Sequence, residues 1–218
     1  IVPANALHAV FFRSPVTAGM IASLDCSAAK AAAGVVAVLT AADAAADGVA
    51  NMVWTGGPVR EDGGVTVDSP RPLLSGAEIR HLGEPVAMII ATSRQAAADA
   101  AELIDVQIDA ADDVALSVEN MLNGPLVWPG TNDNIASLHR QGNRDEVDTI
   151  LATSAHVSHF EFDISKITAC TMEMRTSIGF IDENGKSCVT TSAQSPYQLH
   201  GELAQLFGIS TDEVRVIS

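Results

Sequence analysis

The chain has 218 residues, 47% of them hydrophobic and 18% charged, which is enough to bury the core of one large domain or two small ones and excludes a disordered chain. The formal net charge of -15 argues against nucleic acid and anionic membranes as partners, because both require a basic surface. The cysteines Cys26, Cys170 and Cys188 are widely spaced, and neither a signal peptide nor a membrane-length apolar run occurs, so we expect a cytoplasmic chain without disulfides, metal ligands of its own or membrane insertion.

The first 110 residues predict a compact α+β domain of short strands and helices. Apolar runs predict strands at 7–13, 20–24, 35–39, 86–90 and 106–108. Alanine-rich stretches predict helices at 27–33, where Gly34 suits a C-cap, and after Thr40, which suits an N-cap. A third helix is expected at 96–104, with Ser93 as its N-cap. This alternation of strands and helices is typical of a mixed α/β layer.

Two stretches of the chain lack a periodic apolar pattern. Residues 51–72 are rich in glycine and proline and predict a long loop, either a binding or contact surface or a mobile insertion. Turn residues recur through 111–149, which we interpret as a linker that ends in a short helix at 145–152.

Residues 150–218 predict the opening of a second α+β domain. Strands are expected at 156–163, which alternates strongly, and at 177–181, 186–192 and 213–217, with a helix at 197–207. The pair Asn184-Gly185 favours a tight hairpin between the second and third of these strands.

Gln194 stands where a predicted strand gives way to the predicted helix 197–207. Its side-chain amide offers two donors and an acceptor, and the free N–H groups of a helix start can meet an anion. This is a good position for holding a ligand. The alternative is that Gln194 only caps or crosses a turn.

Other polar groupings in the sequence favour structural roles. His156 and His159 would face opposite sides of a strand, which argues against a metal-ligand pair. Glu173 and Arg175 would share one face and form a structural ion pair. No glycine-rich nucleotide-binding fingerprint and no Gly-x-Ser-x-Gly motif occurs.

Several stretches, taken in order, carry a family resemblance. They are residues 7–15 (LHAVFFRSP), 33–43 (AGVVAVLTAAD), 80–87 (RHLGEPVA), 172–175 (MEMR), 191–196 (TSAQSP), 206–209 (LFGI) and 214–216 (VRV). Together they resemble the molybdopterin-binding subunit of the xanthine dehydrogenase, aldehyde oxidase and carbon monoxide dehydrogenase family, the molybdenum hydroxylases. One departure is Met174, which stands where the family commonly has a proline.

The resemblance implies an architecture. Residues 1–110 would form the family's α/β hammerhead domain, 111–149 a linker, and 150–218 the first part of the α+β molybdenum cofactor domain. Gln194 matches the family's strand-end glutamine that hydrogen-bonds an oxo ligand of molybdenum, so it would lie in the second shell of the metal. The family's Gly-Gly-x-Phe-Gly segment and its late general-base glutamate do not occur in this sequence, so we expect no catalytic residue here and a chain that is catalytically incomplete alone.

The resemblance also implies an activity. The complete enzyme would hydroxylate an aldehyde or N-heterocycle with oxygen from water, or oxidise carbon monoxide. Its cofactor would be molybdenum-molybdopterin, in the cytosine dinucleotide form, shared with the remainder of the molybdenum subunit. Electrons would pass to FAD and 2Fe-2S clusters on partner subunits, within a hetero-oligomer. Two alternatives stay open: a non-catalytic assembly module that keeps the family fold, and a stand-alone acidic α+β binding protein.

Overall fold

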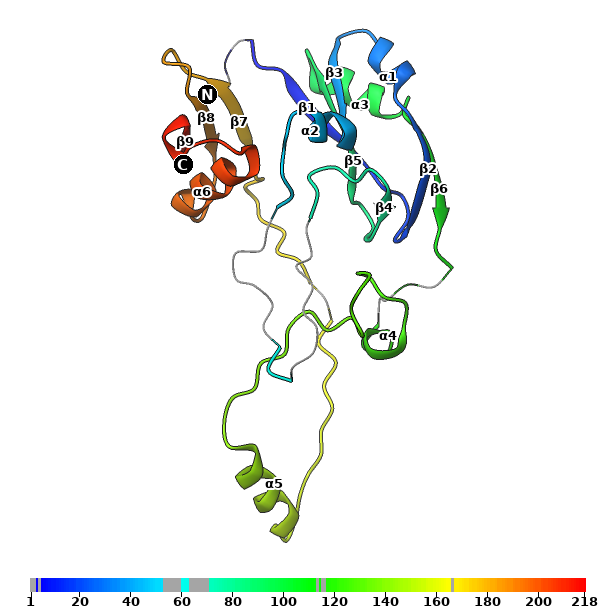
Figure 1. Ribbon diagram of the computed structural model, residues 1–218, viewed down its shortest axis with the longest axis vertical. Helices are drawn as coiled ribbons and strands as arrows, with labels where there is room; N and C mark the ends of the chain where they lie inside the picture. Colours follow the sequence, from blue (N-terminus) through cyan, green and yellow to red (C-terminus); the bar gives the residue numbers. More distant parts are fainter. Residues whose placement is uncertain are drawn as a thin grey trace.

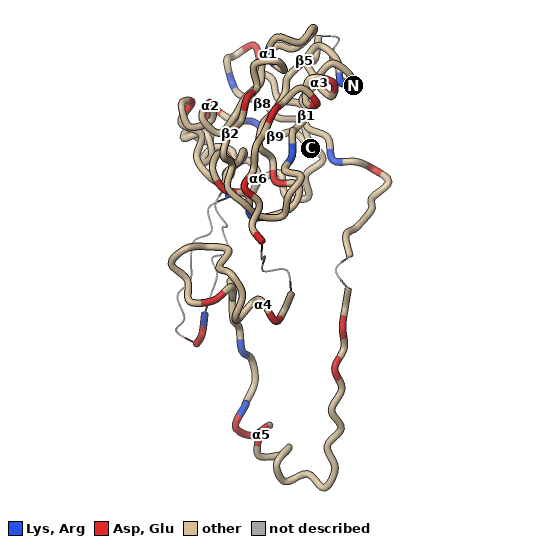
Figure 2. The backbone as a smooth tube through the Cα atoms, turned by 90° about the vertical axis from the view of Figure 1, so that its right-hand side faces the viewer, with Lys and Arg blue, Asp and Glu red and all other residues tan. Residues whose placement is uncertain are grey.

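The computed structural model describes residue 3 and residues 5–52, 60–62, 71–112, 114, 117–165 and 167–218. Figure 1 shows one folded part from the N-terminal half of the chain and another from residues 177–218, lying side by side, while the chain between them extends away from both. Acidic residues are scattered along the backbone of both parts and of the extension, as Figure 2 shows. The predicted α+β class is confirmed.

The first sheet contains the best-buried strand of the molecule. Its order is β1 (His8–Arg13), β5 (Pro85–Ala91), β3 (Val35–Thr40), and both pairs are antiparallel. In the central strand β5, Val86, Ala87, Ile89 and Ala91 have no exposed surface. No residue of β5 is exposed, and a strand buried to this extent needs a nearly continuous apolar run, which is why the sequence alone located it.

Helices α1 (Ser27–Ala31) and α3 (Arg94–Ala101) cover this sheet, and alanine is the residue that lets them approach closely. Ala29, Ala97 and Ala100 lie in the core and are at most 1% exposed. The predicted N-cap is confirmed, because the Ser93 hydroxyl accepts a hydrogen bond from the Ala96 N–H at 3.1 Å. Helix α2 (Ala41–Ala46), which lies between α1 and α3 in the chain, has Thr40 at its N-cap position, as expected.

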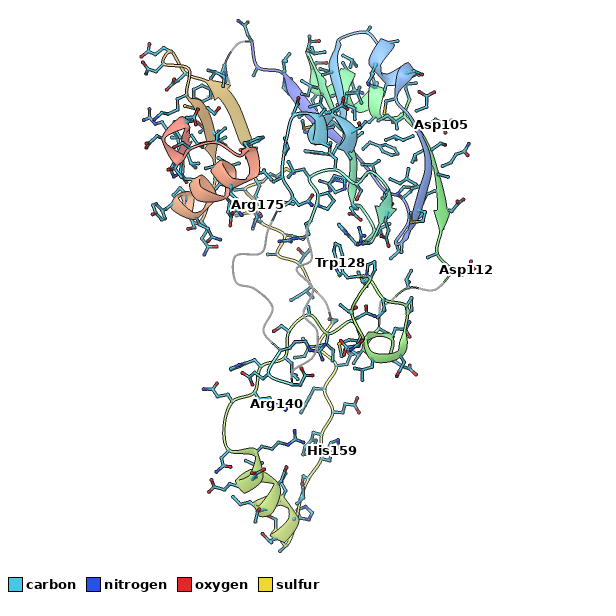
Figure 3. All side chains as sticks on the ribbon, viewed as in Figure 1. Asp105, Asp112, Trp128, Arg140, His159 and Arg175 are labelled. Carbon is cyan, nitrogen blue, oxygen red and sulfur yellow. The ribbon has the colours of Figure 1, made fainter. Side chains whose placement is uncertain are left out.

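The second sheet has the order β4 (Glu78–Ile79), β2 (Gly19–Asp25), β6 (Asp105–Ala110), again antiparallel. Glycine is required where β2 begins, because a Cβ on Gly19 would lie 2.5 Å from the Asp109 carbonyl oxygen. Beneath this sheet, the Trp128 ring lies 4.2 Å from the Arg80 guanidinium carbon (Figure 3). This cation–π contact ties the segment after α4 (Val118–Asn123) to the N-terminal part.

The third sheet joins an antiparallel hairpin to a parallel crossover. Strands β7 (Ser177–Ile181) and β8 (Ser187–Thr191) form the hairpin, and β9 (Val214–Ile217) lies parallel to β8. The predicted hairpin is confirmed, but its loop is longer than a two-residue turn. Only Gly185 has a positive φ, of 79°, and the Asp182 carboxylate accepts the Asn184 and Lys186 N–H groups. The crossover runs through α6 (Pro196–Phe207) and a short 3-10 helix, η1 (Thr211–Glu213).

The expected strand at 156–163 is wrong. Helix α5 (Arg144–Thr153) forms as predicted, but the chain after it is extended without pairing to any strand in the described part of the chain. Apolar and polar residues do alternate here, but such a segment forms a strand only where a second backbone pairs with it. The expected linker, 111–149, carries α4 and the start of α5, and its limits stay a prediction.

Most of the expected loop 51–72 lies outside the described residues. Its described residues Arg60 and Glu61 are tied to the segment before α5. The Arg60 guanidinium, whose side chain is 5% exposed, donates to Asp133 at 2.6 Å. The Glu61 carboxylate accepts the Arg140 N–H at 2.8 Å and lies 2.8 Å from His139 Nδ1. We call these five residues the loop clamp, and they indicate that the loop anchors the chain leading to α5.

The loop clamp should weaken in acid. The Arg60 guanidinium is the main cause that lowers the pKa of Asp133, and the Arg140 N–H and then His139 lower the pKa of Glu61. A carboxyl group whose pKa is lower in the folded state stabilises the fold above its unfolded-state pKa, and that contribution disappears as the pH falls through the folded-state pKa. NMR titration of the carboxyl carbons should give midpoints below the ordinary values of 3.8 for Asp133 and 4.5 for Glu61.

An Arg60→Ala variant provides the control for that titration. It should raise the Asp133 midpoint toward its ordinary value, because it removes the neighbouring positive charge. The Glu61 midpoint should change less, because its main partners are the Arg140 N–H and His139. Unshifted midpoints in the unaltered chain would show that the loop clamp does not form in solution.

No helix in the described residues is long and apolar enough to cross a membrane.

Candidate cofactor site

The site predicted from the sequence lies at the carboxyl end of the parallel pair β8–β9. Strand β8 ends at Thr191, the chain turns through Gln194, and α6 begins at Pro196. The two strand ends meet here, since the Ser218 hydroxyl donates to the Ala193 carbonyl oxygen at 3.4 Å. In sheets with parallel crossovers, ligands bind outside the carboxyl ends of the strands. The topology therefore puts Gln194 at the edge where a ligand is expected.

The Gln194 side chain is free to bind something else. It is exposed, and it makes no hydrogen bond or ion pair with any residue that the structure describes. A glutamine that capped α6 or stabilised the turn would form a hydrogen bond between its side-chain amide and a nearby backbone group. The residue at the N-cap position is instead Ser195, whose side chain makes no capping hydrogen bond either.

The positive end of the α6 dipole, at the first turn of the helix, is therefore not compensated by a side chain. It contains no acidic residue, and Pro196 occupies the position where a missing N–H costs nothing. The Leu199 N–H donates to the Ser195 carbonyl oxygen, so the groups left for a ligand are those of Tyr197 and Gln198. Uncapped N–H groups and the helix dipole together favour an anionic group at this point.

A cavity of about 280 Å³ lies against the start of α6, and its lining includes a charged residue, Arg215, but not Gln194. Its lining consists of Pro196, Tyr197, His200, Val214, Arg215 and Val216. The exposed Arg215 side chain forms no ion pair with a described residue, so its charge is available to an anion in a chain that is otherwise strongly acidic.

His200 has a structural role in this cavity. Its Nε2 lies 2.9 Å from the Thr211 carbonyl oxygen and 3.0 Å from that of Val214. Two carbonyl oxygens can only accept, so Nε2 carries a hydrogen and donates to both. His200 thus holds η1 and the first residue of β9 against α6. Sequence reasoning did not single out His200, and it used Arg215 only as part of the stretch 214–216, without assigning a role to its side chain.

The other candidates from the sequence are not brought to this site. His159 lies on the extended chain beyond the two folded parts (Figure 3). Glu173 and Arg175 are exposed, and the expected ion pair between them does not form. No group of three or more His, Cys, Asp or Glu residues in the described part of the chain could hold a metal ion.

A second cavity, of about 330 Å³, lies at the second sheet. It is lined mainly by residues of β2, β4 and the segment 125–127, with Arg80 and Asp109. It shares no lining residue with the cavity at α6.

Two features of the structure can be compared with known proteins: the two N-terminal sheets, and the β-α-β crossover in which the exposed Gln194 follows the end of β8. Residues 1–112 match the family described as aldehyde oxidase and xanthine dehydrogenase, a/b hammerhead domain, and residues 127–218 match the molybdopterin cofactor-binding domain. The chain belongs to the aldehyde oxidase and xanthine dehydrogenase family, the molybdenum hydroxylases.

Individual relatives agree with this assignment. The chain is 27% identical to the nicotine 6-hydroxylase large subunit of Paenarthrobacter nicotinovorans, over 97% of this chain and 25% of the relative. It is 26% identical to the xanthine dehydrogenase molybdenum-binding subunit of Escherichia coli O157:H7, over 99% of this chain and 28% of the relative. The chain therefore spans about a quarter of the length of these curated relatives.

A solved structure shares the whole fold. Quinoline 2-oxidoreductase from Pseudomonas putida 86 superimposes with a TM-score of 0.85 and 27% identity, over 100% of this chain and 27% of that chain. The superposition includes the extended chain around α5 as well as the two folded parts.

Proposed function

We propose that this chain is part of the molybdenum subunit of an oxidoreductase that hydroxylates an N-heterocycle with oxygen from water. The family match and the free amide of Gln194 at the carboxyl end of β8 support the proposal. The ring class is suggested by relatives whose names refer to nicotine and quinoline, both nitrogen heterocycles, each at 27% identity.

The residues at the candidate site fit a molybdenum-molybdopterin cofactor. The Gln194 amide would donate to an oxygen ligand of the metal, and the uncapped first turn of α6 with Arg215 would suit an anionic group of the cofactor. When bound, the cofactor supplies the two-electron redox chemistry of the hydroxylation. This part of the chain orients the cofactor and provides no general base.

Further subunits complete the proposed enzyme. Hydroxylation with water releases two electrons for each substrate molecule, and these need acceptors other than the substrate. We place them on partner subunits that carry 2Fe-2S clusters and FAD, and we propose the cytosine dinucleotide form of the pterin. Relatives named as a large subunit and as a large chain support a multi-subunit arrangement.

A Gln194→Ala variant of the assembled enzyme tests the assigned role. We expect kcat to fall by about 10–100-fold, because groups that hydrogen-bond a metal's ligands typically contribute that much. The molybdenum content should stay close to that of the unaltered enzyme, because the pterin carries the metal. Steady-state kinetics and elemental analysis of the same preparation provide both numbers.

The matched control is Gln205→Ala, which removes another exposed amide, near the other end of α6. It should leave both kcat and molybdenum content unchanged. Full activity in Gln194→Ala, at normal molybdenum content, would contradict a contact between Gln194 and the cofactor.

A further inference from the structure

The sequence contains two Asn-Gly pairs, Asn123-Gly124 and Asn184-Gly185, and they lie in different structural settings. Asparagine is a thermolabile residue, because the backbone nitrogen of the next residue can attack its side-chain amide carbon. Glycine hinders this attack least, since it has no Cβ. Both asparagines are exposed to water. Local sequence and exposure therefore make the two pairs equivalent, and any difference in their reactivity has to come from the fold.

The first pair lies at the end of a helix. Asn123 is the last residue of α4, and the Gly124 N–H donates to the Asn120 carbonyl oxygen at 2.9 Å. The backbone packs closely at this point, because a Cβ on Gly124 would lie 2.6 Å from that same oxygen. The Gly124 nitrogen reaches the Asn123 side chain only if the backbone leaves its helical conformation, and this change breaks the hydrogen bond.

Asn134 holds the backbone on both sides of this first pair. Its N–H donates to the Met121 carbonyl oxygen, before the pair, at 2.9 Å. Its side-chain amide donates to the Pro125 carbonyl oxygen at 2.9 Å and accepts the Val127 N–H at 2.8 Å, both after the pair. A backbone rotation at Asn123 therefore strains hydrogen bonds on both sides, and the fold protects this asparagine from attack.

The second pair lies in the loop of the β7–β8 hairpin. The Gly185 N–H donates to the Asp182 carbonyl oxygen at 3.0 Å, and the φ angle of Gly185 is 79°. The Asn184 side chain makes no hydrogen bond with any residue in the described part of the chain. Its amide carbon is therefore free to turn toward the Gly185 nitrogen whenever the turn opens.

The Asp182 carboxylate keeps this turn closed. One of its oxygens, Oδ1, accepts the Asn184 N–H and the Lys186 N–H, each at 2.9 Å. The Lys186 N–H is the main cause that lowers the pKa of Asp182, so the group is a carboxylate at neutral pH. Asp182 therefore limits how often the loop reaches the open conformation in which the Gly185 nitrogen can attack.

We propose that Asn184 is a site of spontaneous deamidation whose rate is limited by Asp182, whereas Asn123 is protected. The Gly185 nitrogen loses its proton to water and bonds to the Asn184 Cγ. The Cγ–Nδ2 bond breaks, and the amide takes up a proton and leaves as ammonia. Water then opens the resulting cyclic imide at either carbonyl carbon, which gives aspartate or isoaspartate. The reaction consumes water and releases ammonia without an oxidant or reductant, and it does not depend on molybdenum.

Peptide mapping of the assembled enzyme by mass spectrometry tests the proposal. Incubation in mildly alkaline buffer made with heavy-oxygen water labels each asparagine that deamidates. Label should accumulate at Asn184 at least about 10-fold faster than at Asn123, because the loop opens more readily than the held helix end. In the denatured chain the two sites should react at similar rates. Equal labelling of both sites in the folded enzyme, or no labelling at Asn184, would overturn the proposal.

Two variants assign the protection to particular side chains. Asp182→Ala should raise the rate at Asn184 by about 3–10-fold and leave Asn123 unchanged, because it removes two hydrogen bonds from the loop. Asn134→Ala is the matched change at the other pair, and it should raise the rate at Asn123 alone. An unchanged rate at Asn184 in Asp182→Ala, or an equal rise at both sites, would overturn the local role of Asp182.

Discussion

Replacing Ile89 by alanine is expected to lower the free energy of unfolding by about 2–5 kcal/mol, the range for removing a large aliphatic side chain from a rigid core. Ile89 lies in β5, between β1 and β3, and has no exposed surface. The neighbours Ala97 and Ala100 on α3 belong to the same core and are too small to fill the space left behind. Urea denaturation followed by circular dichroism measures the loss.

The control for this substitution is Ile181→Ala, the same chemical change at a position on β7 that is 66% exposed. It should cost less than about 0.5 kcal/mol, because little apolar area returns to water. Equal losses for the two variants would contradict the assignment of the core to the first sheet.

Glu84→Ala should have the next largest effect. The Glu84 side chain is 7% exposed, and its carboxylate accepts the Ser75 hydroxyl at 2.5 Å and the Arg80 N–H at 2.7 Å. Alanine leaves the Arg80 N–H without its acceptor, while the Ser75 hydroxyl keeps only a longer contact to the Glu78 carbonyl oxygen. We expect a loss of about 1–3 kcal/mol, the cost of leaving one buried polar group unsatisfied.

Glu84→Gln separates hydrogen bonding from packing at this position. The amide keeps the shape and one acceptor oxygen of the carboxylate, so the loss should be less than half of that for Glu84→Ala. Thermal unfolding of both variants under one condition gives the comparison. An equal loss of stability in Glu84→Gln and Glu84→Ala would show that the negative charge of Glu84, and not its hydrogen bonds, stabilises the loop before β5.

Local sequence patterns predicted two kinds of element: those stabilised by residues close in the sequence, and those that are largely buried. The run 86–90 is apolar throughout because every residue of β5 is buried or half-buried. Ser93 predicted the start of α3 because a cap acts on its own helix. The hairpin at Asn184-Gly185 was predicted because a turn is determined by residues close in the sequence. Its loop is longer than the dipeptide suggests, because the Asp182 carboxylate accepts backbone N–H groups within it. The family resemblance, carried by motifs in order, is confirmed by the match over both parts of the chain.

What the sequence could not supply depends on residues that are distant in the chain. The loop clamp pairs Arg60 with Asp133, and no spacing in the sequence indicates that contact. Arg215 reaches the cavity at the start of α6 because β9 returns parallel to β8, and local sequence patterns do not indicate that topology. The segment 156–163 was predicted as a strand from its alternating pattern. Such a pattern indicates that a segment can form a strand with one apolar face, but it does not indicate whether a partner strand is present.

The candidate site itself was predicted in part. Gln194 was singled out as a strand-end residue next to a helix start, and the structure puts it at the carboxyl end of β8 with its amide unbound. Its contact with molybdenum stays a prediction. The alternative, an assembly module that keeps the family fold without the metal, would have the same three sheets, so the cofactor has to be measured directly.

Elemental mass spectrometry on the multi-subunit complex purified from its own source tests the central claim most directly. The account predicts molybdenum close to equimolar with this chain, together with a pterin released on denaturation. An intact, folded complex without molybdenum, from cells whose other molybdenum enzymes are loaded, would contradict the oxidoreductase function and leave an assembly role on the family fold.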